Sequence, residues 1–155
     1  CGGEIGRDPR PGGADAFLDF LEQQLIPFID QTYRTNPADR AILGHSHGGL
    51  FALYAMQQRP KLFQRVVASS PTIGWDNRKL FQPAKLKEFS PPVRLDLSVE
   101  GEPRFRDDVV AFANLLDEIK PNGMKYRMTV HKDENHNSVR IPALSAGLYW
   151  VYAQP

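Results

Sequence analysis

The chain has 155 residues, of which 41% are hydrophobic and 24% charged, and its formal net charge is +1. This balance is typical of a globular domain large enough to bury a core. It contains no apolar run of ~20 residues, and this argues against a membrane-spanning protein. It also has no dense basic stripe, and this argues against nucleic acid as a partner. The one cysteine, Cys1, excludes an internal disulfide, and the compartment, cytoplasmic or periplasmic, stays open.

The first half of the chain predicts one long helix followed by a strand, a helix and a strand. After a segment rich in Gly and Pro over residues 1–13, apolar residues at helical spacing indicate an amphipathic helix over 15–33, kinked or shortened at Pro27. Short apolar runs over 40–45 and 65–70 have the length of strands. Between them, residues 49–58 form a helix that stops before Pro60.

The second half continues the alternation of helices and strands. We expect a broken helix over 77–89, a strand over 93–99, a helix over 106–119, a strand over 125–131 and a helix over 141–153. In the last helix, aromatic residues at helical spacing are expected to belong to the core. These are Tyr149, Trp150 and Tyr152.

This order of elements predicts an α/β fold. Strands separated by helices run parallel, with right-handed crossovers that cover both faces of the sheet. We expect one domain over residues 1–155. Since ligands bind such sheets at the carboxyl ends of the strands, the polar residues that follow the strands should meet there. They lie at 45–48, 69–76, 100–102 and 133–136.

The segment "GHSHG", residues 44–48, fits the Gly-x-Ser-x-Gly pattern of a nucleophile elbow. A strand precedes it and a helix follows, so Ser46 would stand exposed above the sheet edge. Small residues are needed two before and two after the serine, and Gly44 and Gly48 supply them. The backbone N–H of His47 would then lie at a helix N-terminus, where it could stabilise an oxyanion. The alternative is a Gly-rich turn in which Ser46 only caps the helix.

A serine hydroxyl needs a general base, and the chain has four histidines. His45 and His47 flank Ser46, and their side chains should point away from its hydroxyl. His131 ends a strand and is expected to be a surface or partly buried residue. His136 lies in a polar loop before the last helix, where the base belongs when a triad runs Ser, acid, His along the chain.

The acid should follow the strand over 93–99. Glu102 is the favoured candidate and Glu100 the second, and a Ser–His pair without an acid is the remaining alternative. Asp107 and Asp108 open the next helix, where the dipole alone accounts for acidic residues.

Trp75 and its neighbour Asp76 follow the second strand and are candidates for contact with substrate. No cofactor is expected. A metal site built from His45, His47, His131 and His136 is one alternative, although HExxH and paired-carboxylate spacings are absent. A hydrolase-like module without catalysis, used for binding or assembly, is another.

Four segments together resemble the esterase family of α/β-hydrolases, in the branch that includes siderophore trilactone esterases of the enterobactin type. They are "GGADAFLDFLEQQLIPFIDQTY", "RAILGHSHGGLFALYAMQQRPKLFQRVVASSPTIGWDN", "SVEGEP" and "ENHNSV". The resemblance implies a partial α/β-hydrolase fold and hydrolysis of a small-molecule ester through an acyl-enzyme on Ser46, with His136 as base. It also implies that the chain corresponds to the C-terminal half of such a protein. Early strands and a second oxyanion donor would come from a missing N-terminal segment, and that segment or a homo-oligomer would complete the sheet.

Overall fold

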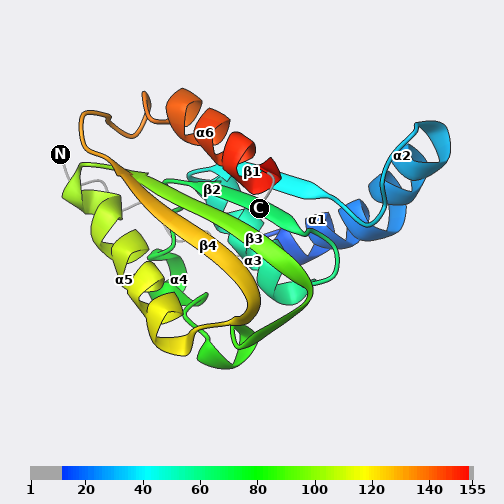
Figure 1. Ribbon diagram of the computed structural model, residues 1–155, viewed down its shortest axis with the longest axis horizontal. Helices are drawn as coiled ribbons and strands as arrows, with labels where there is room; N and C mark the ends of the chain where they lie inside the picture. The colour runs from blue at the N-terminus through cyan, green and yellow to red at the C-terminus, as the bar shows by residue number, and fades with distance from the viewer. Residues whose placement is uncertain (1–11, 154–155) are drawn as a thin grey trace. The chain divides into compact units, whose positions relative to one another are not determined.

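The computed structural model describes residues 12–153 (Figure 1). Cys1 and most of the segment predicted to be a loop over 1–13 lie outside the described residues. The chain divides into two compact units, residues 1–35 and 36–155. That the whole chain forms one domain stays a prediction.

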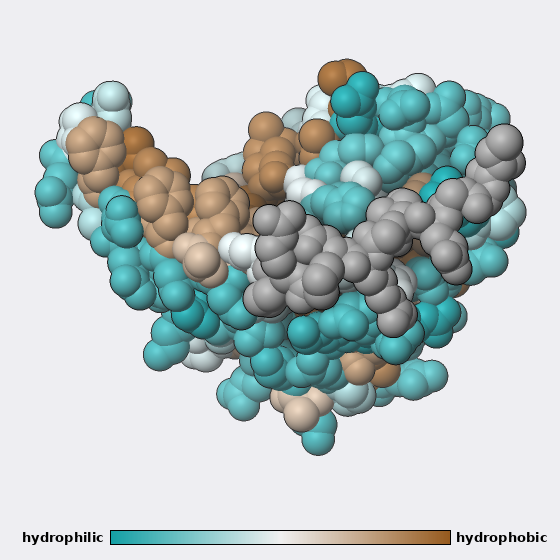
Figure 2. Space-filling model, turned by 180° about the vertical axis from the view of Figure 1, so that it is seen from behind, coloured by the Kyte–Doolittle hydropathy of each residue, from teal (hydrophilic) through white to brown (hydrophobic). Residues whose placement is uncertain are grey.

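The described part of the first unit contains one continuous helix, as the spacing of its apolar residues predicts. It consists of α1 (Ala14–Phe20), a π-helical turn η1 (Leu21–Leu25) and α2 (Ile26–Thr32). Pro27 does not end the helix. The π-helical turn ends at Leu25, two residues before Pro27, and its wider backbone accommodates a proline, which has no N–H to donate. Exposed apolar side chains gather along one side of this helix (Figure 2). They are Phe17, Phe20, Leu25 and Phe28.

The second unit is built on the predicted parallel sheet. Its strands are β1 (Ala41–His45), β2 (Arg65–Ser69), β3 (Glu88–Glu100) and β4 (Asn122–His131). They lie in the order β1-β2-β3-β4, and each neighbouring pair is parallel (Figure 1). Because the pairing runs in register, His45, Ser69 and Ser98 align at one end of the sheet.

Helices cover both faces of the sheet, which confirms the α/β fold class. On one face, α3 (His47–Gln58) and α5 (Pro103–Ile119) enclose the core with strand residues such as Val66 and Leu95. The alternate strand residues point to α6 (Arg140–Tyr152) on the other face, where a Cβ on Gly147 would lie 2.5 Å from Val67. No helix within residues 12–153 is both long and apolar enough to cross a membrane.

The broken helix predicted over 77–89 is wrong for most of its length. The segment contains only the end of the short turn α4 (Trp75–Arg78) and a 3₁₀ turn η2 (Pro83–Lys85), and β3 already begins at Glu88. Asp76, Asn77 and Arg78 all have positive φ, a conformation that does not continue a right-handed helix.

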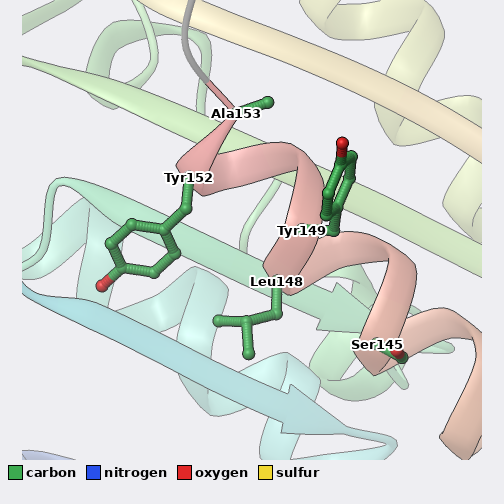
Figure 3. A pocket seen from close by; sticks show the side chains of 5 residues that line it. All are labelled: Ser145, Leu148, Tyr149, Tyr152 and Ala153. Carbon is green, nitrogen blue, oxygen red and sulfur yellow. The ribbon is translucent and has the colours of Figure 1, made fainter.

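The aromatic residues of α6 are not all in the core, contrary to expectation. Tyr149 is 82% exposed and Tyr152 45% exposed. Both line a hollow on the outer surface of α6, and Leu148 and Tyr152 extend from the same side of the helix (Figure 3). Trp150 instead lies under two guanidinium groups, those of Arg94 and Arg127.

Arginines from three strands hold the C-terminal end of α6. Arg65 donates to the carbonyl of Val151, and Arg94 donates to the carbonyls of Trp150 and Ala153 at 2.8 and 3.0 Å. Arg127 donates to the carbonyl of Ala146 at 2.8 Å. The carbonyls of Trp150, Val151 and Ala153 lie at the C-terminal end of the helix, where cations are favourable and intrahelical donors run out, whereas Ala146 lies in the middle of the helix. The sheet therefore fixes α6 in place through charge-assisted hydrogen bonds as well as packing.

The two glycines that flank Ser46 differ in what they permit. A Cβ on Gly44 would lie 2.0 Å from the carbonyl oxygen of Gly48, so β1 and α3 approach each other too closely there for any side chain. A Cβ on Gly48 would meet nothing within 4 Å, and its φ lies outside the left-handed region. The expectation that both positions require a small residue therefore holds for Gly44 alone.

We predict that Gly44→Ala and Gly48→Ala have opposite outcomes. The first should lower the free energy of unfolding by more than about 2 kcal/mol, because overpacking displaces α3 from β1. The second should leave it unchanged or raise it by about 1 kcal/mol, since alanine favours a helix over glycine. Urea unfolding of the two variants beside the wild type measures both; equal destabilisation would contradict the assignment of the contact to Gly44.

Candidate active site

Ser46 occupies the sharp turn between β1 and α3. Its backbone has φ 56° and ψ −118°, outside the regions that residues other than glycine normally adopt. Three backbone hydrogen bonds hold this conformation. The N–H of Ser46 donates to the carbonyl of Ser69 at 2.9 Å, and the carbonyl of Ser46 accepts from the N–H groups of Leu50 and Thr72 at 3.0 and 3.3 Å. A strained serine between a strand and a helix is the geometry of a nucleophile elbow.

One line of hydrogen bonds joins Ser46, His136 and Glu100. The Nε2 atom of His136 lies 3.1 Å from Oγ of Ser46, ninety residues away in the sequence. Its Nδ1 atom lies 2.8 Å from Oε1 of Glu100. The imidazole thus has a hydroxyl on one side and a carboxylate on the other, within the reach required for proton transfer.

Glu102, the favoured acid from the sequence, does not take the position beside His136. It is the exposed N-cap residue of α5, whereas Glu100 is the last residue of β3 and its side chain is 0% exposed. The predicted strand over 93–99 ends one residue before β3 does, which put Glu100 in the loop. Glu100 belongs to the sheet, which aims its side chain at His136.

Glu100 is a buried carboxylate with several hydrogen-bond partners. Burial by itself raises its pKa. The hydroxyl of Ser70, the N–H of Glu100 itself and the imidazole of His136 outweigh burial, so the pKa lies below its ordinary value of 4.5. Ser70 is fully buried and donates to Oε2, the oxygen that His136 does not use. From the sequence, Ser70 was one of the polar residues at 69–76 expected at this edge of the sheet, and nothing marked it as a donor to Glu100.

Two rings lie against the imidazole of His136. The ring of Phe105, on α5, has its centroid 4.5 Å away, and the ring of His45 has its centroid 4.7 Å away. These distances are typical of packed aromatic rings. Phe105 was not a candidate from the sequence, because it reads as an ordinary apolar residue in the first turn of a helix.

His47 and Trp75 meet beside the elbow. Their ring centroids lie 5.7 Å apart in an edge-to-face arrangement, and Trp75 is 55% exposed. Asp76, the other candidate for substrate contact, is exposed and forms an ion pair with Lys79 at 3.4 Å. Since His47 is the first residue of α3, its backbone N–H is one of the helix N-terminal donors that lack an intrahelical acceptor.

The four histidines do not converge on one point. His45 and His136 are neighbours, His47 packs against Trp75, and His131 ends β4. Within residues 12–153 no group of three His, Cys, Asp or Glu side chains is arranged to hold a metal ion.

Proteins named as esterases are similar to this sequence over most of its length. The siderophore enterobactin esterase of Emericella nidulans is 30% identical over 92% of the chain. The ferri-bacillibactin esterase BesA of Bacillus subtilis is 29% identical over 88% of it. The chain spans 58% and 50% of the lengths of these two relatives.

The fold of the chain is also similar to that of solved structures. The BES protein from Bacillus cereus superimposes with a TM-score of 0.85 at 26% identity, covering 94% of the chain and 58% of that protein. The siderophore hydrolase EstA from Aspergillus nidulans gives a TM-score of 0.69 at 28% identity, covering 97% and 62%. The family model described as "Putative esterase" matches residues 5–124. The chain belongs to this esterase family.

Proposed function

We propose that the protein is a serine-dependent ester hydrolase, with Ser46 as nucleophile, His136 as general base and Glu100 as the acid of the triad. One observation carries the proposal: the imidazole of His136 contacts Oγ of Ser46 through Nε2 and Oε1 of Glu100 through Nδ1. Membership of the esterase family supports the same reaction class.

The first half-reaction is acylation. Oγ of Ser46 attacks the ester carbonyl carbon while Nε2 of His136 takes the hydroxyl proton. The oxyanion forms near the N-terminus of α3, where the N–H of His47 donates to it. The intermediate collapses when the bond between the carbonyl carbon and the alcohol oxygen breaks. The alcohol leaves with the proton from Nε2, and the acyl group stays on Ser46.

The second half-reaction repeats these steps with water. His136 accepts a proton from water, and the resulting hydroxide attacks the acyl carbon. The Ser46–acyl bond then breaks, and Oγ of Ser46 regains its proton from Nε2. The products are a carboxylic acid and a regenerated serine.

Glu100 supports both steps without exchanging a proton. Its carboxylate accepts from Nδ1–H of His136, which fixes the tautomer with Nε2 free to act as base. In the transition state it faces the imidazolium. Because Glu100 is buried, that interaction is weakly screened by solvent.

The substrate class proposed from the relatives is a siderophore ester. One of the two sequence relatives is named a siderophore enterobactin esterase and the other a ferri-bacillibactin esterase. Trp75, half exposed beside His47, offers an aromatic surface to the acyl or aryl part of such a substrate. Asp76 is proposed to contact polar groups farther from the reacting carbonyl.

Covalent labelling tests whether Ser46 is the nucleophile. A fluorophosphonate probe should label Ser46 of the full-length protein, and Ser46→Ala should abolish both labelling and turnover of nitrophenyl butyrate and a siderophore trilactone. Ser145→Ala, on the outer surface of α6, is the matched control and should behave as wild type. Mass-spectrometric peptide mapping identifies the labelled residue. Absence of label in folded wild-type protein would favour a module that binds without catalysis.

Substituting each glutamate in turn tests which of the two is the acid of the triad. Glu100→Gln should lower kcat by ~10²–10⁴, because an amide cannot stabilise the imidazolium as a carboxylate does. Glu102→Gln removes an exposed charge and should change kcat less than about twofold. Steady-state kinetics on nitrophenyl butyrate measures both. A large loss in the Glu102 variant with none in the Glu100 variant would restore Glu102 as the acid.

Two buried serines test the hydrogen bond to Glu100: Ser70, which follows β2, and Ser98, which lies on β3. Ser70→Ala should lower the free energy of unfolding at pH 7 by about 1–3 kcal/mol, because a buried carboxylate oxygen loses its donor. Ser98→Ala should cost little, since the Ser98 hydroxyl has no partner among the described residues.

The effect of Ser70→Ala should depend on pH. Glu100 has a folded pKa below 4.5, so its contribution is complete above 4.5 and is lost as the pH falls through the folded pKa. In the variant the folded pKa rises, and less stability remains to be lost. Urea unfolding from pH 7 to pH 3 should therefore show the two proteins converging; a constant gap would contradict the role of Ser70 as donor to the carboxylate.

A further inference from the structure

Two adjacent aspartates of α5 have different partners. Asp107 is 70% exposed and pairs at 3.3 Å with Arg106, its neighbour on the same helix. Asp108 is 30% exposed and pairs with Arg78, on the turn after β2. The first turn of α5, where the helix dipole acts most strongly, contains no acidic residue. The dipole alone therefore does not account for Asp108, contrary to the expectation from the sequence.

Both carboxylate oxygens of Asp108 lie against residues 74–78, the segment that contains α4 (Figure 1). Oδ1 accepts from Nε and Nη2 of Arg78 at 2.9 and 2.6 Å. Oδ2 occupies the space next to Gly74, where a Cβ would lie 2.1 Å from it. Asp108 thus contacts this segment on both sides of Trp75.

The backbone of α4 is strained. Asp76, Asn77 and Arg78 have φ of 51°, 52° and 58°, in the left-handed region that is unfavourable for residues with a side chain. Such conformations persist where the surrounding structure holds them. The ion pair of Asp76 is local, since its partner Lys79 follows directly in the chain. The pair between Arg78 and Asp108 instead joins the strained turn to α5.

Trp75 is the first residue of this turn, and its backbone is held before and after it. Its N–H donates to the carbonyl of Thr72 at 3.1 Å, and the N–H of Thr72 donates to the carbonyl of Ser46 at 3.3 Å. The bond of Arg78 to Asp108 holds the chain that follows. Because the indole is 55% exposed, its own packing contributes little, and its position follows from that of the backbone.

We propose that Asp108 is a positioning residue for the substrate, acting through Arg78 to hold the ring of Trp75 beside the elbow. The inference rests on the proposed function, in which Trp75 contacts the acyl or aryl part of an ester. A ring that is fixed in advance binds an aromatic group without the entropy cost of being ordered. Loss of the ion pair should therefore weaken the binding of aromatic esters and leave the chemical step at the triad unchanged.

Two esters test this role in the full-length protein. Nitrophenyl benzoate carries an aromatic ring on both sides of the ester bond, and methyl butyrate carries none. In Asp108→Ala, KM for nitrophenyl benzoate should rise about 3- to 10-fold, the range expected for one aromatic contact. Its kcat should stay nearly constant, because only uniform binding is lost. KM for methyl butyrate, followed by proton release, should stay at the wild-type value.

Variants of the neighbouring charges complete the comparison. Arg78→Gln removes the other partner of the pair and should behave like Asp108→Ala. Asp107→Ala removes the adjacent aspartate, which does not reach α4, and it is the matched control that should retain wild-type KM for both esters. Because an exposed ion pair contributes little to stability, all three variants should fold. Circular dichroism and urea unfolding verify this.

A double-mutant cycle tests whether Asp108 acts through Trp75. Trp75→Ala should raise KM for nitrophenyl benzoate at least as much as Asp108→Ala does. Adding Asp108→Ala to Trp75→Ala should then change KM by less than about twofold, because the ring that Asp108 positions is already absent. A small alkyl fluorophosphonate should label Ser46 at the wild-type rate in every variant, since this reaction reports the nucleophile and its base.

Each outcome has a distinct meaning. If wild-type Ser46 is not labelled, the proposed function fails, and this inference fails with it. If the wild type is labelled and Asp108→Ala leaves KM for nitrophenyl benzoate unchanged, the positioning role alone is overturned. It is also overturned if the effects of Asp108→Ala and Trp75→Ala multiply. A slower labelling of Asp108→Ala, or an equal rise in KM for both esters, would overturn it as well, because Asp108 would then act on the fold at large.

Discussion

The close approach of α3 to β1 at Gly44 is the constraint on which the site depends. A Cβ at this position would lie 2.0 Å from the carbonyl oxygen of Gly48, so the helix can start directly after the strand only because glycine is present. The tight turn forces Ser46 into a strained backbone conformation. The packing of the sheet against its helices stabilises the fold enough to retain this strain, and it leaves the serine hydroxyl at the carboxyl edge of the sheet.

The fold must also stabilise the buried carboxylate of Glu100. An ionised carboxylate away from water is unfavourable unless hydrogen bonds replace its hydration. Ser70 on one oxygen and His136 on the other supply them, together with the N–H of Glu100 itself. These partners come from three separate parts of the chain, so the buried carboxylate has all its hydrogen bonds only when β2, β3 and the loop after β4 are all in place.

The site could be predicted in part from the sequence. Ser46 and His136 were identifiable as candidates because an elbow has a local pattern and because the histidine expected as base follows the last strand in this topology. The choice between Glu100 and Glu102 was not available, since it depends on where β3 ends, and strand ends are poorly marked by local composition. Ser70, Phe105 and the contacts of His45 were equally hidden, because each acts through a neighbour that is distant in the sequence. The broken helix over 77–89 was misread because Pro83 and the positive φ of Asp76, Asn77 and Arg78 overrode its apolar spacing.

The sequence by itself determined the alternation of strands and helices, the parallel direction of the sheet and the position of the elbow, because each of these follows from periodicity or from residues close together in the chain. Only the tertiary structure decided which carboxylate faces His136, which glycine the elbow requires and which rings enclose the imidazole. Those outcomes depend on the register of parallel strands and on contacts between segments up to ninety residues apart. Side chains at such separations meet only after the sheet has formed.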